Sequence, residues 1–180
     1  MYFYHSKLLF LFHLKENSIK RKINASIKAL NKRPEVVKPV RRVVILNNPQ
    51  SKLDFENLKY IQKVFDLSNI QFDIFTFKEK NDHYNELPGI VADKNIFSVF
   101  GKIKTPEIQE FLEKRYDLLL DFTGMSNLYE KYLSLAIKAS FRVGYINDDE
   151  LYDLMLDIPK KNIKLFADET VKYLKIIKLI

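Results

Sequence analysis

The sequence predicts an α/β fold: a three-layer domain with a mainly parallel sheet of about five strands, preceded by a basic N-terminal helix. Short apolar runs rich in β-branched and aromatic residues occur at 41–47, 70–77, 117–122 and 141–145. Segments with helical spacing separate these runs, so we expect right-handed crossovers between parallel strands. Together these observations predict a Rossmann-like arrangement with helices on both faces of the sheet.

The chain is long enough for one such domain, since 180 residues, 47% of them hydrophobic, can bury a sizeable core. We expect residues 1–40 to form a basic helical arm with its linker, and residues 41–180 to form the single domain. The arm is predicted to be helical over 7–33 and to end before the prolines at 34 and 39. Its apolar residues recur at helical spacing: Ile19, Ile23, Ile27 and Leu30.

Positive charge is concentrated in this arm. The net charge of the chain is +7, but residues 1–42 hold eleven basic and two acidic residues, which gives them +9 and leaves −2 for the rest. Such asymmetry is typical of proteins that bind RNA, DNA or an anionic membrane surface. The competing interpretation is a solvated helix that packs back onto its own domain. The candidate nucleic-acid contacts are Lys7, Lys15, Lys20, Arg21, Lys22, Lys28, Lys32, Arg33, Lys38, Arg41 and Arg42.

In the first half of the domain, the run 41–47 predicts a buried first strand. The spacing of Ser51 and Asp54 is a capping pattern, so we expect a helix to open at Ser51 and to reach about Leu67. A second strand is predicted over 70–77, a polar loop over 78–94 and a short strand over 95–100.

In the second half, Thr105 followed by Pro106 predicts a helix start, with the helix reaching about Arg115. A buried strand over 117–122, a helix over 127–140 and a strand over 141–145 follow. Residues 151–158 fit either a weak strand or a short helical turn. A final helix is predicted over 167–178.

Several kinds of chemistry are disfavoured by composition. The absence of cysteine excludes disulfides, thiolate metal sites and cysteine nucleophiles, and it fits a reducing cytoplasm. The three histidines are dispersed, and the acidic residues of 148–157 lack the glycine and spacing of a calcium loop. The turn after 41–47 contains no glycine, which disfavours a nucleotide phosphate there. We therefore expect no catalytic residues, no metal site and no cofactor.

Two charged residues in the apolar strands are exceptions to this pattern. Asp121 is the most plausible functional carboxylate, because ligands of α/β proteins bind at the carboxyl ends of strands. The alternative is that it caps the following turn. Arg142 is an unusual cation within an apolar strand, where it either pairs with Asp121 or faces solvent at a sheet edge.

Two segments carry a resemblance to a known family. They read YDLLLDF at 116–122 and LAIKASFRVGY at 135–145, and a YDLM run follows at 152–155. In these motifs the chain resembles an uncharacterised family of small Rossmann-like α/β proteins from Bacteroidota, which also have a basic N-terminal helix and a terminal helix. The resemblance covers nearly the whole chain and implies no particular activity.

The same core is similar to the N-terminal half of heptosyltransferase-type glycosyltransferases, in which an aspartate-bounded strand is followed by a helix and an R-x-G strand. The chain departs from that pattern because the glycine-rich first turn and its aspartate are missing, as is the C-terminal nucleotide-sugar domain. This resemblance therefore supports the fold and argues against catalysis.

The function predicted first is a non-enzymatic, cytoplasmic binding protein that is associated with RNA or the ribosome through its basic helix, while its α/β body docks a protein partner. One alternative is a degenerate glycosyltransferase-like domain that binds a sugar or a nucleotide. Another is a peripheral membrane protein, with the apolar run 8–12 inserted into an anionic surface. That run is much shorter than the roughly 20 residues that span a bilayer.

Overall fold

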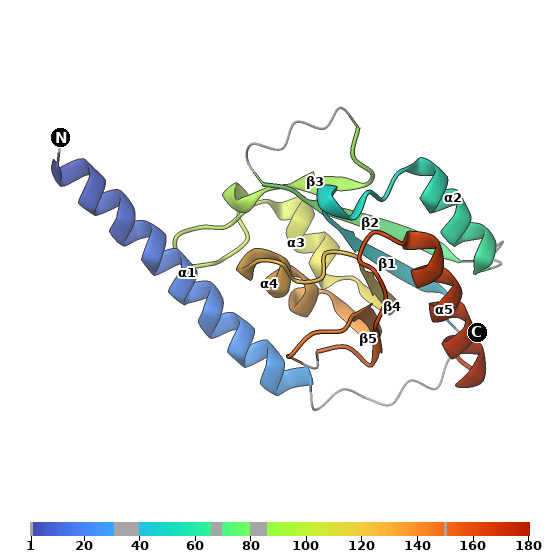
Figure 1. Ribbon diagram of the computed structural model, residues 1–180. Coiled ribbons are helices and arrows are strands. Elements are labelled where there is room, and N and C mark those ends of the chain that lie inside the picture. The colour runs from blue at the N-terminus through green and yellow to red at the C-terminus, as the bar shows by residue number, and fades with distance from the viewer. Residues whose placement is uncertain (1, 31–39, 66–69, 80–85, 150) are drawn as a thin grey trace.

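The computed structural model describes residues 2–30, 40–65, 70–79, 86–149 and 151–180. Its strands are β1 (Arg42–Asn47), β2 (Gln71–Phe77), β3 (Ile90–Ala92), β4 (Arg115–Asp121), β5 (Lys138–Tyr145) and β6 (Leu154–Leu156). Within these ranges they form one parallel sheet in the order β3-β2-β1-β4-β5-β6 (Figure 1). This is the strand order of the Rossmann fold, and it confirms the predicted fold class with six strands in place of about five.

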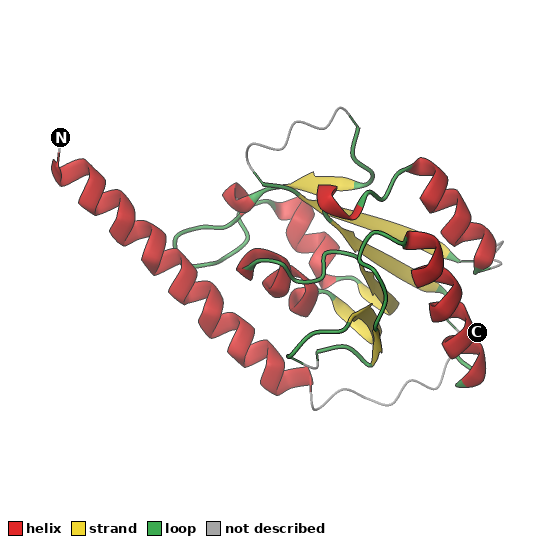
Figure 2. Cartoon of the chain, viewed as in Figure 1, coloured by secondary structure: helices red, strands yellow, loops and turns green. Residues whose placement is uncertain are grey.

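Helices cover both faces of the sheet (Figure 2). They are α1 (Tyr2–Leu30), α2 (Phe55–Val64), α3 (Pro106–Glu113), α4 (Leu128–Ala136) and α5 (Ile163–Ile176), with short 3₁₀ turns η1 (Pro49–Ser51) and η2 (Lys94–Ile96). Along β1, Val43 and Ile45 pack under α2 and α5, whereas Val44 and Leu46 pack on the α3 and α4 side. The strand is continuously apolar because both of its faces are buried.

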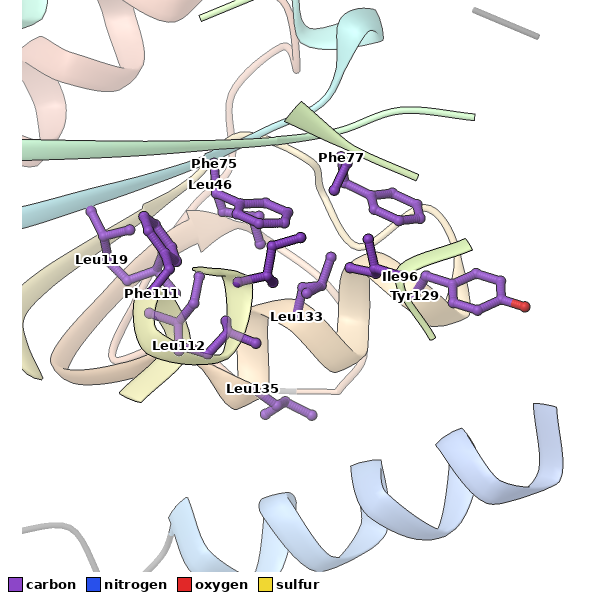
Figure 3. Packing of buried hydrophobic residues seen from close by; sticks show 14 of the residues in the cluster. Leu46, Phe75, Phe77, Ile96, Phe111, Leu112, Leu119, Tyr129, Leu133 and Leu135 are labelled. Carbon is purple, nitrogen blue, oxygen red and sulfur yellow. The ribbon is translucent and has the colours of Figure 1, made fainter. Parts of the chain in front are cut away.

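The N-terminal helix α1 forms an additional layer on the outside of α4. Ile19 and Ile23 are 0% and 4% exposed and belong to the same core cluster as α3 and α4 (neighbouring members of this cluster are shown in Figure 3). The predicted apolar stripe is therefore packed on the domain, as the competing interpretation of the arm expects. The N-terminal end of α1 extends beyond the domain, as Figure 1 shows. Residues 31–33 of the predicted helix and the linker 35–38 lie outside the described residues.

The prediction for the segment between β2 and α3 was wrong. The predicted strand over 95–100 is absent, and the strand β3 lies within the segment expected to be a loop. Gly89, at φ 76°, lets the chain come so close to β2 that a Cβ there would lie 2.1 Å from the carbonyl oxygen of Ile74. Asp93 then accepts a hydrogen bond from the N–H of Asn95 (2.7 Å) and begins η2 instead of a strand.

Several helix boundaries also differ from the prediction, and α1 begins at Tyr2, five residues earlier than expected. Helix α2 is capped by Asp54, which accepts from the N–H of Asn57 (2.8 Å), whereas Ser51 belongs to η1. Helix α5 begins at Ile163, four residues earlier than expected, because Asn162 caps it. Helix α4 ends at Ala136 and not at Ser140, and the segment from Lys138 onward is strand. The segment 151–158, left open between two alternatives, contains β6.

The early end of α4 has a tertiary cause. The guanidinium of Arg142 in β5 donates hydrogen bonds to the carbonyl oxygens of Ser134 and Ile137. Those carbonyls are left without helical partners at the end of α4. Arg142 donates to both from the neighbouring strand, and the Ile137 carbonyl also accepts from the N–H of Ala139. Arg142 is 2% exposed, which excludes one of its two predicted alternatives, that it faces solvent at a sheet edge.

Candidate nucleic-acid interface

Asp121, which the sequence offers either as a functional carboxylate or as a cap for the following turn, is fully buried at the end of β4. One of its oxygens accepts hydrogen bonds from the N–H (2.9 Å) and the hydroxyl (2.6 Å) of Thr123, in the turn that follows. Burial raises the pKa of Asp121, and the hydroxyls of Ser134 and Thr123 oppose that rise. This geometry is that of a turn cap, the alternative considered from the sequence.

A second buried carboxylate, Glu130, lies at the topological switch point between β1 and β4, where the strand order of the parallel sheet reverses. It accepts hydrogen bonds from the Asn48 side-chain amide (2.9 Å) and from the N–H (2.8 Å) and hydroxyl (2.6 Å) of Ser126. Nucleotide-binding Rossmann domains present free N–H groups to phosphate at this place. Here the N–H of Ser126 is bound to the chain's own carboxylate, and burial raises the pKa of Glu130.

Glu130 was not predicted as a notable residue. The signal for it was present, since Asn127 caps α4 by accepting from the N–H groups of Tyr129 and Glu130, and Glu130 follows the cap by three residues. That spacing is the capping-box pattern. Its partner Asn48, on a distant turn, could be found only from the fold.

The basic residues of α1 fall into two groups. Lys20, Arg21 and Lys28 are exposed, and Arg21 and Lys28, two helical turns apart, lie opposite the apolar stripe. We call these three residues the outer basic face. Lys15 and Lys22 are half-buried against the domain: the Lys15 ammonium lies over the rings of Phe97 (5.9 Å) and Tyr129 (5.6 Å), and the Lys22 ammonium lies over the ring of Tyr132 (5.9 Å).

The remaining predicted contacts are spread over the chain. Lys7 lies in α1, and Lys32, Arg33 and Lys38 lie outside the described residues. Arg41 and Arg42 are exposed at the start of β1, where their backbone N–H groups both donate to Asp117 (2.9 and 2.8 Å). The structure thus places the outer basic face together on one helix and puts Arg41 and Arg42 at the amino edge of the sheet.

Lys15 also lies close to two basic residues, Lys94 and Lys104, that the sequence analysis did not single out. Its ammonium donates to the carbonyl oxygen of Lys94 (2.6 Å). Burial lowers the pKa of Lys15, and the nearby ammonium groups of Lys104 and Lys94 lower it further. These lysines come from α1, η2 and the loop before α3, so they meet only in the folded chain.

The described residues also bear on metal sites and on membrane-spanning helices. In the part of the chain that the structure describes, no three histidine, aspartate or glutamate side chains are grouped so that they could hold a metal ion. Among the same residues, no helix has both the length and the apolar content needed to cross a bilayer.

Comparison with curated proteins and with solved structures finds no match. The similarity to glycosyltransferases therefore stays a prediction. A model described as a family of unknown function, DUF6913, matches residues 15–177. The match begins at Lys15, which contacts η2, and includes the buried part of α1, the whole sheet and all of α5. The chain belongs to this family of unknown function, DUF6913.

Proposed function

We propose that this protein is a non-enzymatic binding protein that binds RNA phosphates along α1, most plausibly in a ribonucleoprotein such as the ribosome. The observation that supports this proposal is the orientation of α1. Its apolar residues Ile19 and Ile23 are buried on the domain, while the outer basic face, Lys20, Arg21 and Lys28, is exposed. A basic helix held in this way presents its cations without having to fold first.

The fixed position of α1 favours binding. A disordered basic segment loses conformational entropy when it is ordered on its partner, which reduces its affinity. The packing of Ile19 and the hydrogen bond from Lys15 to the carbonyl of Lys94 order this helix before any partner arrives. The cations can then displace counterions from RNA phosphates at little further cost.

The interior of the sheet supports a binding role over catalysis. Asp121 and Glu130, the two buried carboxylates at the carboxyl edge, are 0% and 2% exposed and already accept hydrogen bonds from the chain itself. A general acid or base must reach its substrate. The fold is compatible with a degenerate glycosyltransferase-like domain, but the Ser126 N–H at the usual diphosphate site already donates to Glu130.

The proposal is tested by sedimentation with ribosomal particles, with and without ribonuclease. We expect the protein to sediment with RNA-containing fractions and to be released by ribonuclease. The variant Lys20→Gln, Arg21→Gln, Lys28→Gln should remain at the top of the gradient. A control with the same loss of charge is Lys59→Gln, Lys63→Gln, Lys175→Gln, which changes exposed lysines of α2 and α5. If the α1 variant sediments as the wild type does, the proposal is wrong.

A second candidate function, peripheral binding to an anionic membrane, is favoured by the far end of α1. Four successive apolar side chains are exposed there: Leu9, Phe10, Leu11 and Phe12. Apolar residues beside a basic helical segment are typical of helices that lie in a lipid interface. Figure 1 shows that this end projects from the domain, so that it could reach a surface.

A further inference from the structure

A hollow at the carboxyl end of β2 lies outside the proposed basic face. It has a volume of about 310 Å³ and is bounded by Phe12 of α1, by Phe77 and Lys78 at the end of β2, by Lys94 of η2, and by Asn127 and Tyr129 at the start of α4. We call it the β2 hollow. Its size is at the lower end of the range of small-molecule sites. Its position at the carboxyl edge of a parallel sheet is where α/β folds bind ligands.

Several lysines line the β2 hollow or lie close to it. Lys78 and Lys94 line it, and Lys78 also lines an adjoining hollow with Lys104. Lys15 adds a further cation, since its ammonium reaches the carbonyl of Lys94. Bringing these cations together is unfavourable, as the lowered pKa of Lys15 shows, because burial and then Lys104 and Lys94 disfavour its charge. An anion in the hollow would relieve this repulsion.

Two carboxylates lie near these lysines. Glu79 lines the hollow, and Asp93 partly offsets the effect of the lysines on Lys15. Asp93 is engaged by the N–H (2.7 Å) and the side-chain amide (3.1 Å) of Asn95. A third carboxylate, Glu16, lies near Tyr129. Four lysines against three carboxylates leave the neighbourhood of the hollow with a net charge of about +1.

The hydroxyl of Tyr129 lacks a partner. Tyr129 is 9% exposed, and its hydroxyl is buried without a hydrogen bond to any described residue. The ring is held between Phe77 and Phe97, with centroids 6.0 and 5.3 Å away, so the hydroxyl cannot turn elsewhere without moving the core. Figure 3 shows that hydroxyl at the outer end of the cluster, beyond Ile96. Burial raises the pKa of Tyr129, as does the nearby Glu16 carboxylate, so the group remains a donor.

Leaving a buried donor unpaired is unfavourable, and an acceptor supplied by a ligand would remove that penalty. A phosphate oxygen is such an acceptor, and ammonium groups stabilise its charge. Phe12 supplies the remaining element of recognition. Phe12 is 43% exposed and lines the hollow, on the same face of α1 as Ile19. An exposed aromatic ring offers a surface on which a nucleobase can stack.

We propose that the β2 hollow binds one nucleotide unit of single-stranded RNA, with its phosphate at Lys78, Lys94 and the Tyr129 hydroxyl and its base on the ring of Phe12. This inference rests on the proposed RNA-binding function of α1 and assigns it a nucleotide subsite. Because a paired base cannot leave its helix to reach Phe12, the hollow gives α1 a preference for single strands over duplexes.

The test uses two probes. Binding of 5′-adenosine monophosphate is measured from NMR chemical-shift changes of the Asn127 and Tyr129 backbone amides. Binding of a fluorescently labelled ten-nucleotide oligouridine is measured by fluorescence anisotropy. Tyr129→Phe removes only the hydroxyl, so we expect about tenfold weaker binding of both probes, the usual effect of one lost hydrogen bond to a charged group. The matched control is Tyr132→Phe, which removes a hydroxyl that does not line the hollow. Lys78→Gln with Lys94→Gln should weaken binding further, whereas Lys102→Gln should not.

The outcomes separate this inference from the proposed function. If the variant of the outer basic face loses the oligonucleotide while Tyr129→Phe binds both probes like the wild type, the inference is wrong and the function stands. If adenosine monophosphate binds and depends on Tyr129 while oligouridine binding is indifferent to the outer basic face, the hollow is a nucleotide site and the function is wrong. Equal losses in Tyr129→Phe and Tyr132→Phe would also overturn the inference.

Discussion

The side chain of Lys15 reaches from α1 to the backbone of η2, where its ammonium donates a hydrogen bond of 2.6 Å to the carbonyl oxygen of Lys94. This contact lies one turn before Ile19, which is fully buried. The two contacts fix the helix that carries the outer basic face. They also make α1 part of the core, so that the stability of the domain and its proposed binding surface depend on the same helix.

Removing the Ile19 side chain should therefore destabilise the whole domain. Ile19→Ala is expected to lower the free energy of unfolding by about 2–5 kcal/mol, because a buried side chain is lost and a cavity remains. Ile27→Ala, at a partly buried position of the same stripe, should cost less. Urea denaturation measures both. Equal and negligible losses would mean that α1 does not pack on the domain in solution.

Arg142→Met should destabilise the domain by about 1–3 kcal/mol, since the buried carbonyl of Ser134 loses the hydrogen bond from Arg142 and the Ile137 carbonyl keeps only the one from the Ala139 N–H. Arg115→Met is the matched control, because Arg115 is exposed at the start of β4 and its loss should change stability by less than about 0.5 kcal/mol. The difference between the two urea midpoints is the measurement. Similar midpoints would show that Arg142 does not cap α4.

The raised pKa of Asp121 predicts how stability varies with pH. A carboxyl group whose pKa is higher in the folded than in the unfolded chain binds more protons when folded, so the free energy of unfolding falls as pH rises. The pH range over which the free energy of unfolding falls begins near 3.8, the ordinary pKa of Asp121, and extends to its raised pKa in the folded chain. Asp121→Asn should remove this contribution. Urea titrations from acid to neutral pH should thus give a flatter profile for the variant, and parallel profiles would contradict it.

The exposed end of α1 predicts a result for the membrane alternative. Phe10→Ser changes a side chain that is 66% exposed, so stability should change by less than about 0.5 kcal/mol. If the protein binds lipid, this change should weaken sedimentation with vesicles of anionic lipid, and vesicles of neutral lipid should bind neither form. Undiminished sedimentation of Phe10→Ser would remove the basis for the membrane alternative.

The elements of the fold could be predicted from the sequence where the local hydrophobic pattern matches the burial of the residues. The run of leucines in β4 is apolar because Leu118 and Leu120 face one layer and Leu119 the other, and that pattern predicts a buried parallel strand. The sequence was insufficient where a distant residue decides. The end of α4 depends on Arg142, and β3 depends on the close approach of Gly89 to Ile74.

The candidate site divides in the same way. The outer basic face could be predicted because its residues are neighbours on one helix and their charge is visible in the composition. The β2 hollow could not, because Lys78, Lys94 and Tyr129 come from three elements that meet only in the folded sheet. The missing partner of the Tyr129 hydroxyl is a property of packing, which no spacing in the sequence records.

The most direct test of the central claim, that the outer basic face of α1 binds RNA phosphates, is the salt dependence of affinity for single-stranded RNA. Each phosphate contact contributes a log–log slope of about −0.7, so three contacts from Lys20, Arg21 and Lys28 predict a slope of about −2. The variant with glutamine at all three positions should lose this slope together with most of its affinity. An affinity that does not change with salt, or a variant with the affinity and slope of the wild type, would contradict the claim.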